Sequence, residues 1–444
     1  MRKHIQFTLL FIEAFVSKHK KQLVLSFVGG FILTVLLFRV YPYISEITSN
    51  HQIRIGLVGR FQSDSLPTAV LDKITLGLTS LSASGEASPS LALSWENDEK
   101  GLTYLFKLKQ NMYWHDGKLF TAKDISYPLK GLETQVVDDY TLKIILKEPY
   151  APLPVLLSRS IIRNDFIGLG LYKVHATQVS GDDLSQIDLY PTVKGYPTLE
   201  YKFYPTNSEA ILAYKLGEID RLEELSDPAD LGSWKNTKIN ITNLYDRMVG
   251  IFINLRNPNF NDKEVRQALA LGTPAFPDYE KAISPLSPLS WAYSRKIRVY
   301  NYDPEAAIKI LSKSPFASES SELVLSTFPS LLSSAQTIAD TWNKLGVKTR
   351  VKVENSIPSD YDVMLLVQSI PPDPDQYQYW QSTQEGTNLT HYNNPKIDKF
   401  LEDGRKEIDK DKRMKIYADF QRYLVDDVPV IFMYYPKSYT VERK

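Results

Sequence analysis

The sequence predicts an α/β protein, or one with mixed α+β sheets, preceded by one transmembrane helix. The chain has 444 residues, which is too many for one ordinary core and favours two or three domains. Strand and helix patterns alternate along it; the clearest run has strands at 323–328 and 347–353 around a helix at 334–345. An uncharged apolar stretch at 23–38 predicts the membrane helix.

Composition excludes several classes of function. The 52 basic and 52 acidic residues leave no net charge, which argues against a nucleic-acid partner. The chain has no cysteine, so disulfides, thiolate metal sites, cysteine nucleophiles and a lipid anchor on cysteine are impossible. The six histidines are scattered, and no H-E-x-x-H pair, G-x-S-x-G elbow or P-loop is present. We therefore expect no enzyme, no catalytic residue, no metal site and no cofactor.

The amino terminus predicts an uncleaved membrane anchor. With Arg39 reaching the interface and residues 40–44 added, the apolar stretch is long enough to span a bilayer, which takes about 20 residues. Five basic residues precede it, so the positive-inside bias places residues 1–22 in the cytoplasm, the anchor at 23–44 and a linker at 45–52 outside. A cleaved signal peptide is the alternative, but the following residues lack an A-x-A-like cleavage site.

Outside the membrane, the first strand is expected at 53–57, followed by a polar loop at 59–65 and a helix at 66–78. The most informative stretch is 104–126. Apolar Tyr104, Phe106 and Leu108 alternate as in a half-buried strand, and residues 115–118 have turn chemistry. Thr121 then stands where an N-cap belongs, with Asp124 at capping-box spacing before a helix. His115 could be a ligand or a base, although a structural role for such a histidine–aspartate turn is favoured.

This stretch resembles the F-x-L-R-x-x-V-x-W-H-D-G-x-x-x-T-A-x-D-V signature of the extracytoplasmic solute-binding proteins of family 5, the peptide- and nickel-binding group of ABC importers. Further blocks resemble the family in order from about residue 53 to 440. They are 81–95, with a hairpin turn at Gly85; 200–222, with a helix at 207–216 that ends at Gly217; 260–271; and 300–311, with a helix capped by Asp303. The chain also departs from the family. The interval between the blocks at 126 and 139 is short, and Leu171 replaces a proline.

The resemblance implies a two-lobed periplasmic-binding-protein fold of the large oligopeptide-binding type. The first lobe would comprise 53–245 plus 430–444, with a subdomain at about 79–164, and the second lobe 246–429. A ligand would be enclosed between the lobes by hinge closure. The residues that the resemblance places near the ligand are Arg60, Gln62, Tyr245, Arg247, Asn254, Gln368, Asp373, Trp380, Tyr434 and Tyr435.

One departure concerns the loop near Asp373. Peptide-binding members of the family commonly carry an aspartate three residues before a D/E-P pair, where it pairs with the peptide α-amino group. Counting back from Asp373 without gaps gives Ile370; a gapped alignment would let Asp373 take that role. Asp373 and Asp375 could also form a metal site or a pair of catalytic carboxylates, although carboxylates in a proline-rich loop are usually solvated or capping.

The function implied is an extracytoplasmic receptor of an ABC importer, anchored in the plasma membrane by a single pass. It would capture oligopeptides or a similar small solute and work with ABC permease and ATPase subunits. A sensor or scaffold protein that retains the fold without transport is the alternative. An anchored extracellular hydrolase is a third possibility, but the sequence lacks a catalytic constellation for it.

Overall fold

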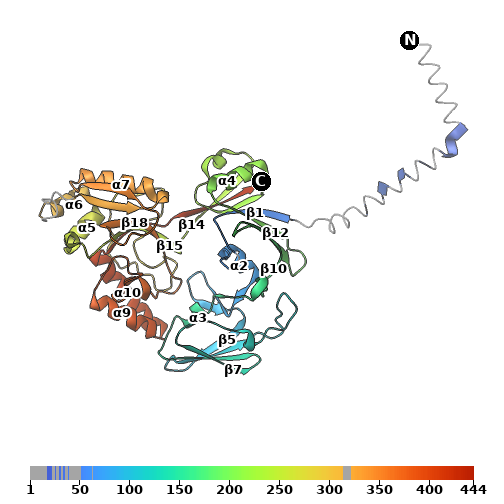
Figure 1. Ribbon diagram of the computed structural model, residues 1–444, viewed down its shortest axis with the longest axis horizontal. Coiled ribbons are helices and arrows are strands. Elements are labelled where there is room, and N and C mark those ends of the chain that lie inside the picture. Colours follow the sequence, from blue (N-terminus) through green and yellow to red (C-terminus); the bar gives the residue numbers. More distant parts are fainter. Residues whose placement is uncertain are drawn as a thin grey trace, which may run out of the picture.

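The computed structural model describes residues 52–62, 64–313 and 322–444, together with 18–22, 26, 30–31, 34–35 and 39 (Figure 1). The predicted cytoplasmic tail, anchor and linker therefore lie largely outside the described residues. Within the described part of the chain, no helix is both long enough and apolar enough to cross a membrane.

The first lobe is built on a seven-stranded mixed sheet. Its central strand β1 (Gln52–Val58) pairs in parallel with β12 (Thr198–Tyr204) and β13 (Arg221–Leu225). The strand order is β10-β11-β12-β1-β13-β20-β14, where the remaining strands are β10 (Tyr172–Ser180), β11 (Asp183–Pro191), β20 (Lys437–Arg443) and β14 (Thr237–Asn243).

Of two predicted helices in this lobe, one has the predicted bounds and the other is shorter. Helix α4 (Asn207–Leu216) is capped by Thr206 and ends at Gly217, whose φ of 82° is the left-handed conformation that glycine adopts most easily. Helix α2 (Thr68–Ile74) is shorter than the predicted helix at 66–78, since the chain continues into β2 (Leu76–Gly77).

The second lobe is built on a five-stranded sheet in the order β17-β16-β18-β15-β19. The strands are β15 (Arg247–Ile253), β16 (Leu323–Thr327), β17 (Thr349–Val353), β18 (Val363–Ser369) and β19 (Val430–Tyr434). The helices are α5 (Lys263–Leu271), α6 (Pro304–Leu311), α7 (Leu332–Lys344), α8 (Tyr377–Trp380), α9 (Pro395–Lys406) and α10 (Lys410–Asp427). As predicted, Asp303 caps α6 ahead of Pro304.

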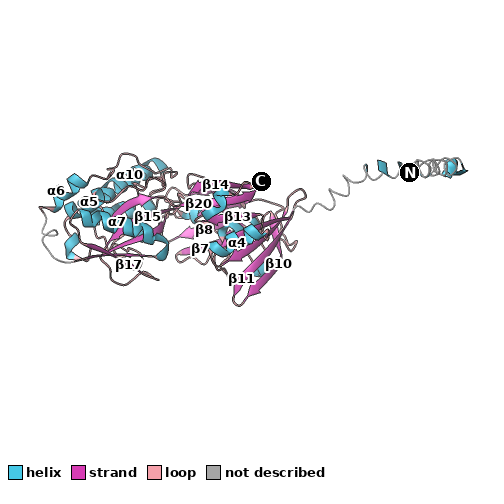
Figure 2. Cartoon of the chain, turned by 90° about the horizontal axis from the view of Figure 1, so that it is seen from above, coloured by secondary structure: helices cyan, strands magenta, loops and turns pink. Residues whose placement is uncertain are grey.

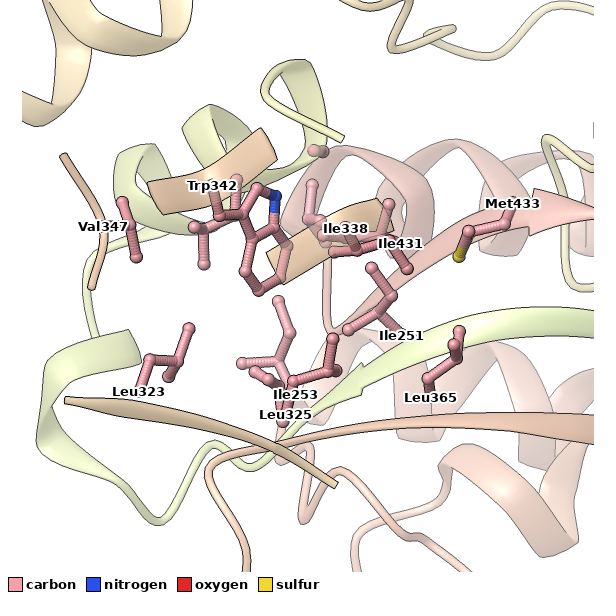
Figure 3. Packing of buried hydrophobic residues seen from close by; sticks show 14 of the residues in the cluster. Ile251, Ile253, Leu323, Leu325, Ile338, Trp342, Val347, Leu365, Ile431 and Met433 are labelled. Carbon is pink, nitrogen blue, oxygen red and sulfur yellow. The ribbon is translucent and has the colours of Figure 1, made fainter. Parts of the chain in front are cut away.

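Both faces of this second sheet are buried. Successive residues of a strand point to opposite faces, so Ile251 and Ile253 join a cluster with Trp342 of α7, as Figure 3 shows. Met248 and Phe252 belong to a cluster on the other face, which includes residues of α9 and α10. A sheet buried on both faces forms the rigid centre of the second lobe.

A subdomain of the first lobe contains the 104–126 stretch. Its four-stranded sheet has the order β5-β6-β8-β7, formed by β5 (Ala92–Asn97), β6 (Thr103–Leu108), β8 (Thr141–Leu146) and β7 (Leu132–Asp138). Near it lie α3 (Leu153–Leu156), β9 (Ser160–Ile161), which pairs with β2, and the hairpin of β3 (Thr79–Leu81) and β4 (Ala87–Pro89).

The predicted helix after Thr121 is only one 3-10 turn, Ala122–Asp124. The carboxylate of Asp124 accepts a hydrogen bond from the backbone N–H of Thr121 at 2.8 Å, as the capping box requires. Pro128 follows four residues later, and the residue before a proline disfavours helical backbone angles. The helix therefore does not continue.

The chain crosses between the two lobes twice, after β14 and after β19. The prediction assigned all of 430–444 to the first lobe, and here it needs correction. Strand β19 pairs with β15 in the second sheet, whereas β20 pairs with β13 and β14 in the first. The boundary therefore lies at about Pro436, because the apolar β19 completes the second core. Figure 2 shows β15 and β17 in one lobe and β14 and β20 in the other.

Candidate ligand-binding cleft

A cavity of about 460 Å³ lies where the two lobes meet. Four segments line it. Residues 81–85 of the subdomain hairpin and 243–246 of the first crossing come from one side, and residues 287–290 and 370–372 of the second lobe come from the other. Its volume is within the range of about 300–1,000 Å³ that is usual for small-molecule sites.

The hairpin tip packs directly on the loop of the second lobe. Gly85 has a φ of +81°, and a Cβ atom placed on it would lie 2.1 Å from the carbonyl oxygen of Pro372. Only glycine fits such a position without a shift of the backbone. The close approach fixes the hairpin against the loop and closes one side of the cavity.

Two ion pairs, one buried and one partly buried, hold the loop that contains Asp373. Both carboxylate oxygens of Asp373 accept hydrogen bonds from Arg413 of α10, at 2.5 and 2.9 Å, and both side chains are less than a tenth exposed. Asp375 pairs with Arg405 of α9 at 2.9 Å. Burial lowers the pKa of Arg413, but the neighbouring charge of Asp373 outweighs this effect and leaves the pKa above its ordinary value.

This pairing revises the expectations for Asp373. Its carboxylate is less than a tenth exposed and paired with a guanidinium, so the pair has no net charge to offer a ligand ammonium group or a metal ion. Asp373 nevertheless lines two smaller cavities beside the loop, of about 230 and 340 Å³. Within the described residues, no group of three or more histidine, aspartate or glutamate side chains is placed to hold a metal ion. Ile370, the other candidate position, is buried and donates its backbone N–H to the carbonyl oxygen of Asp246 at 2.6 Å.

The subdomain also contacts the second lobe beside the cavity. Glu86 pairs with Lys410, and Glu148 pairs with Lys406 at 2.8 Å. The backbone N–H of Ala151 donates to the carbonyl oxygen of Arg405 at 2.8 Å. These contacts join the start of α10 and the end of α9 to the subdomain, so the structure has the two lobes in contact.

Tyrosines lie at both crossings between the lobes. The hydroxyl of Tyr245 donates to Glu280 at 2.5 Å, and its ring packs edge-on against Tyr435 with centroids 5.2 Å apart. Tyr434 is buried; its ring stacks on Tyr279, and its hydroxyl is 3.0 Å from that of Ser334. Of the ten predicted site residues, Tyr245 lines the cavity of about 460 Å³, and Asp373 lines the two smaller cavities between the subdomain and the second lobe.

Three further predicted residues lie inside the second lobe. Asn254 is buried and donates to the carbonyl oxygen of Tyr361 at 2.7 Å. Trp380 is buried and donates to Gln376 at 3.2 Å. Gln368 is buried on β18 opposite Met248. Because Asn254 and Trp380 have their polar groups bonded internally, we assign them to the core rather than to the site.

The remaining predicted residues are exposed. Arg60 follows β1 with 73% of its side chain exposed, at 4.0 Å from Asp183, and Gln62 is also exposed. Arg247 begins β15 and pairs with its neighbour Asp246 at 2.8 Å. Near the 59–65 loop, Asp64 and Ser65 line a second cavity of about 1230 Å³ in the first lobe, together with α2 and residues 158–166.

Sequence reasoning missed two of the four lining segments. Residues 287–290 lie in a region without regular periodicity, so no element was predicted there. The hairpin tip was predicted as a turn at Gly85 but not as part of the site. Serines and a glycine at such positions indicate turns, and nothing in that chemistry indicates which surface the turn contacts.

The molecule has two lobes, each with its own sheet, which are joined by two crossings and enclose a cavity. This arrangement defines a two-lobed solute-binding protein. Comparison with known families makes the assignment specific. Residues 86–388 match the sequence model of "Bacterial extracellular solute-binding proteins, family 5 Middle". The chain therefore belongs to the bacterial extracellular solute-binding proteins of family 5.

Known proteins similar to this chain include the oligopeptide-binding protein AppA of Bacillus subtilis, which is 26% identical over 85% of this chain and 84% of its own length. Among solved structures, NikZ from Campylobacter jejuni in complex with Ni(L-His) has a TM-score of 0.73 at 25% identity, covering 88% of this chain and 94% of NikZ. AppA from Bacillus subtilis in complex with a nonapeptide has a TM-score of 0.68 at 23% identity, with the same coverage. These relatives are binding proteins rather than enzymes.

Proposed function

We propose that this protein is a membrane-anchored receptor of an ABC importer, which captures a peptide or a similar small solute outside the cytoplasm. The observation that carries the proposal is the cavity between the two lobes of a family 5 solute-binding protein. Its walls come from both lobes and from a crossing between them, so a ligand held there would favour the closed arrangement.

Peptides are the favoured class of ligand. The relatives named above include an oligopeptide-binding protein and its complex with a nonapeptide. The complex of NikZ with Ni(L-His) makes a small metal chelate the second class to test. The ABC permease and ATPase subunits would be the partners of the loaded receptor.

Residues 23–38 support the proposed anchor, since they carry no charge and follow a basic segment. The main domain would then lie outside the cytoplasm. Alkaline extraction of membranes tests this: the full chain should stay in the membrane fraction, and a chain lacking residues 1–44 should be released. Release of the full chain would contradict the anchor while leaving the ligand site untouched.

Ligand capture is tested with the full chain purified in detergent. Small molecules that co-purify would be identified by mass spectrometry, and binding of a peptide pool would be measured by calorimetry. Replacing Tyr245, which lines the cavity, by alanine should weaken binding by about tenfold or more. Tyr113→Ala is the matched control, because Tyr113 is 56% exposed and does not line the cavity.

Saturable binding that Tyr245→Ala weakens and Tyr113→Ala does not would support the proposal. Absence of any saturable ligand among peptides and nickel chelates would contradict it. Saturable binding without ligand uptake in cells that express the matching permease would favour the sensor or scaffold alternative.

A further inference from the structure

The second lobe contains a cavity of its own, of about 200 Å³. It is lined by β19, by the ends of α5 and α10 and by parts of the segment between α5 and α6. None of its described lining residues also lines the cavity between the lobes. Its volume is below the range of about 300–1,000 Å³ that is usual for drug-sized ligands, so it suits a single ring rather than a peptide.

The wall of this cavity is mostly apolar and aromatic. Residues 430–433 of β19 all line it. Because successive side chains of a strand point to opposite faces, four consecutive residues can line one cavity only along the edge of the strand, and β19 is the last strand of its sheet. Four aromatic side chains also contribute to the wall, namely Phe276, Tyr279, Tyr300 and Tyr302. Such a wall favours a ligand with a flat, apolar body.

The lining includes an ammonium group without a carboxylate partner. Lys281 donates to the carbonyl oxygen of Tyr300 and, at 3.1 Å, to the side-chain oxygen of Asn301. It forms no ion pair within the described part of the chain, and the carboxylate of the neighbouring Glu280 is bonded to side chains of the first crossing instead. An ammonium group has three N–H bonds, so one remains for a ligand. Although the Lys281 side chain reaches the surface, burial lowers its pKa, because no carboxylate compensates for the lost water.

A second cation lies in the same wall. Arg298 stacks over the ring of Tyr300, with 4.8 Å between its guanidinium carbon and the ring centroid, and contacts Asp426 at 3.5 Å. Asp426 also pairs with Lys263 at 2.8 Å, so one carboxylate serves two cations. The described lining contains these two cations and no acidic residue, so its charge is complementary to an anion.

We propose that this cavity is a second ligand site, which binds a small aromatic carboxylate. The ring of the ligand packs on the apolar wall beside β19, and its carboxylate accepts a hydrogen bond from Lys281. An aromatic amine would bring a like charge to Lys281 and Arg298, and a neutral ring would leave the ammonium group unpaired. The site is separate from solute capture between the lobes and does not depend on it.

The test uses benzoate and its uncharged analogue benzamide with the full chain in detergent at neutral pH. Saturation-transfer NMR titrations should give benzoate a dissociation constant of about 1 mM or lower, and benzamide should bind about tenfold more weakly. Lys281→Met keeps the apolar stem and removes the charge, so it should weaken benzoate by about tenfold and leave benzamide and peptide binding unchanged. Lys415→Met is the matched control, because Lys415 is exposed on α10 and does not line the cavity.

Absence of benzoate binding would overturn the proposal, and so would equal binding of benzoate and benzamide by the unaltered chain. Equal effects of Lys281→Met and Lys415→Met on benzoate would show that the carboxylate does not bind at this cavity. Thermal unfolding of both variants should match that of the unaltered chain, since both side chains reach the surface. Peptide binding is measured separately, so failure of this site would leave the proposed capture between the lobes untouched.

Discussion

Two turns of this molecule share a local structure and differ in what surrounds them. In the first lobe, Asp116 accepts the backbone N–H two residues further on, that of Lys118, at 3.0 Å. In the second lobe, Asp373 accepts the N–H of Asp375 at 2.9 Å in the same way. Asp116 lies at the surface beside Lys118, whereas Asp373 is buried and bound to Arg413, 40 residues further along the chain.

The difference shows that a turn motif specifies its own backbone shape. It does not specify whether the turn is exposed, binds a ligand or packs in the interior. The bond from an aspartate to the N–H two residues on is local and follows from the side chain's length. Whether the second carboxylate oxygen meets solvent, a ligand or an arginine depends on which helix packs above it. In this protein α10 supplies the arginine, and the loop of Asp373 therefore serves as a rigid wall of the cavity.

The largest effect should follow from breaking the buried pair. Asp373→Ala leaves the guanidinium of Arg413 buried without its partner, which should lower the free energy of unfolding by about 3–5 kcal/mol. Urea denaturation of the full chain in detergent, followed by tryptophan fluorescence, measures this.

The matched control is Asp419→Ala, which breaks the exposed pair with Arg422 on the same helix. That change should cost about 0–1 kcal/mol. The double variant Asp373→Leu with Arg413→Met removes both charges and should recover much of the loss. Equal effects of Asp373→Ala and Asp419→Ala would show that the loop is not held by its arginine.

The same contrast explains what the sequence could predict. The strand at Tyr104–Leu108, the turn at Gly117 and the caps at Asp303 and Gly217 depend on spacings of a few residues, and the structure has them. The two-lobed fold came from the ordered family motifs rather than from periodicity, because α/β alternation fits many topologies.

The cleft itself was harder to predict. The lining segment 287–290 has no regular pattern, and its contact with the hairpin tip depends on tertiary packing. Likewise, nothing local distinguishes Asp373 from a solvated carboxylate, since its partner lies on another helix. Motifs located the loop of Asp373 near the cleft, but only the packing of α9 and α10 shows that its carboxylates face inward.

A second prediction compares the glycines of the two regions. Gly117 and Gly85 have nearly the same φ, +83° and +81°, but a Cβ atom on Gly117 would meet open space and one on Gly85 would meet Pro372. Gly117→Ala should therefore cost about 1–2 kcal/mol for the left-handed backbone alone. Gly85→Ala should cost about 2–4 kcal/mol, since a steric clash is added.

Thermal unfolding of both variants measures this difference, and ligand binding measures its consequence. Gly85→Ala should also weaken ligand binding, because the hairpin must move away from the loop that closes the cavity. Gly117→Ala should leave binding unchanged. Similar stability losses in the two variants would show that the hairpin tip can shift at little cost in free energy and does not fix the cavity wall.

The smallest effect concerns His115, beside the surface turn. Its Nε2 lies 3.0 Å from the carbonyl oxygen of Gly170, and its Nδ1 accepts the backbone N–H of Gly168 at 3.3 Å, which assigns the neutral ring with the proton on Nε2. Burial lowers the pKa of His115, and the bond to Gly170 opposes this only in part.

The folded state therefore takes up this proton at a lower pH than the unfolded chain does. Its stabilising contribution is complete above the unfolded pKa of about 6.5 and is lost as the pH falls from there through the folded pKa. His115→Gln removes this titration, so the loss of stability between pH 7 and pH 5 should be smaller than in the unaltered chain, by less than about 1 kcal/mol. Unfolding measured at both pH values gives the comparison. An identical pH dependence in the two chains would show that the bond from Gly168 does not hold the neutral ring, and that the turn is fixed by its aspartate and glycine alone.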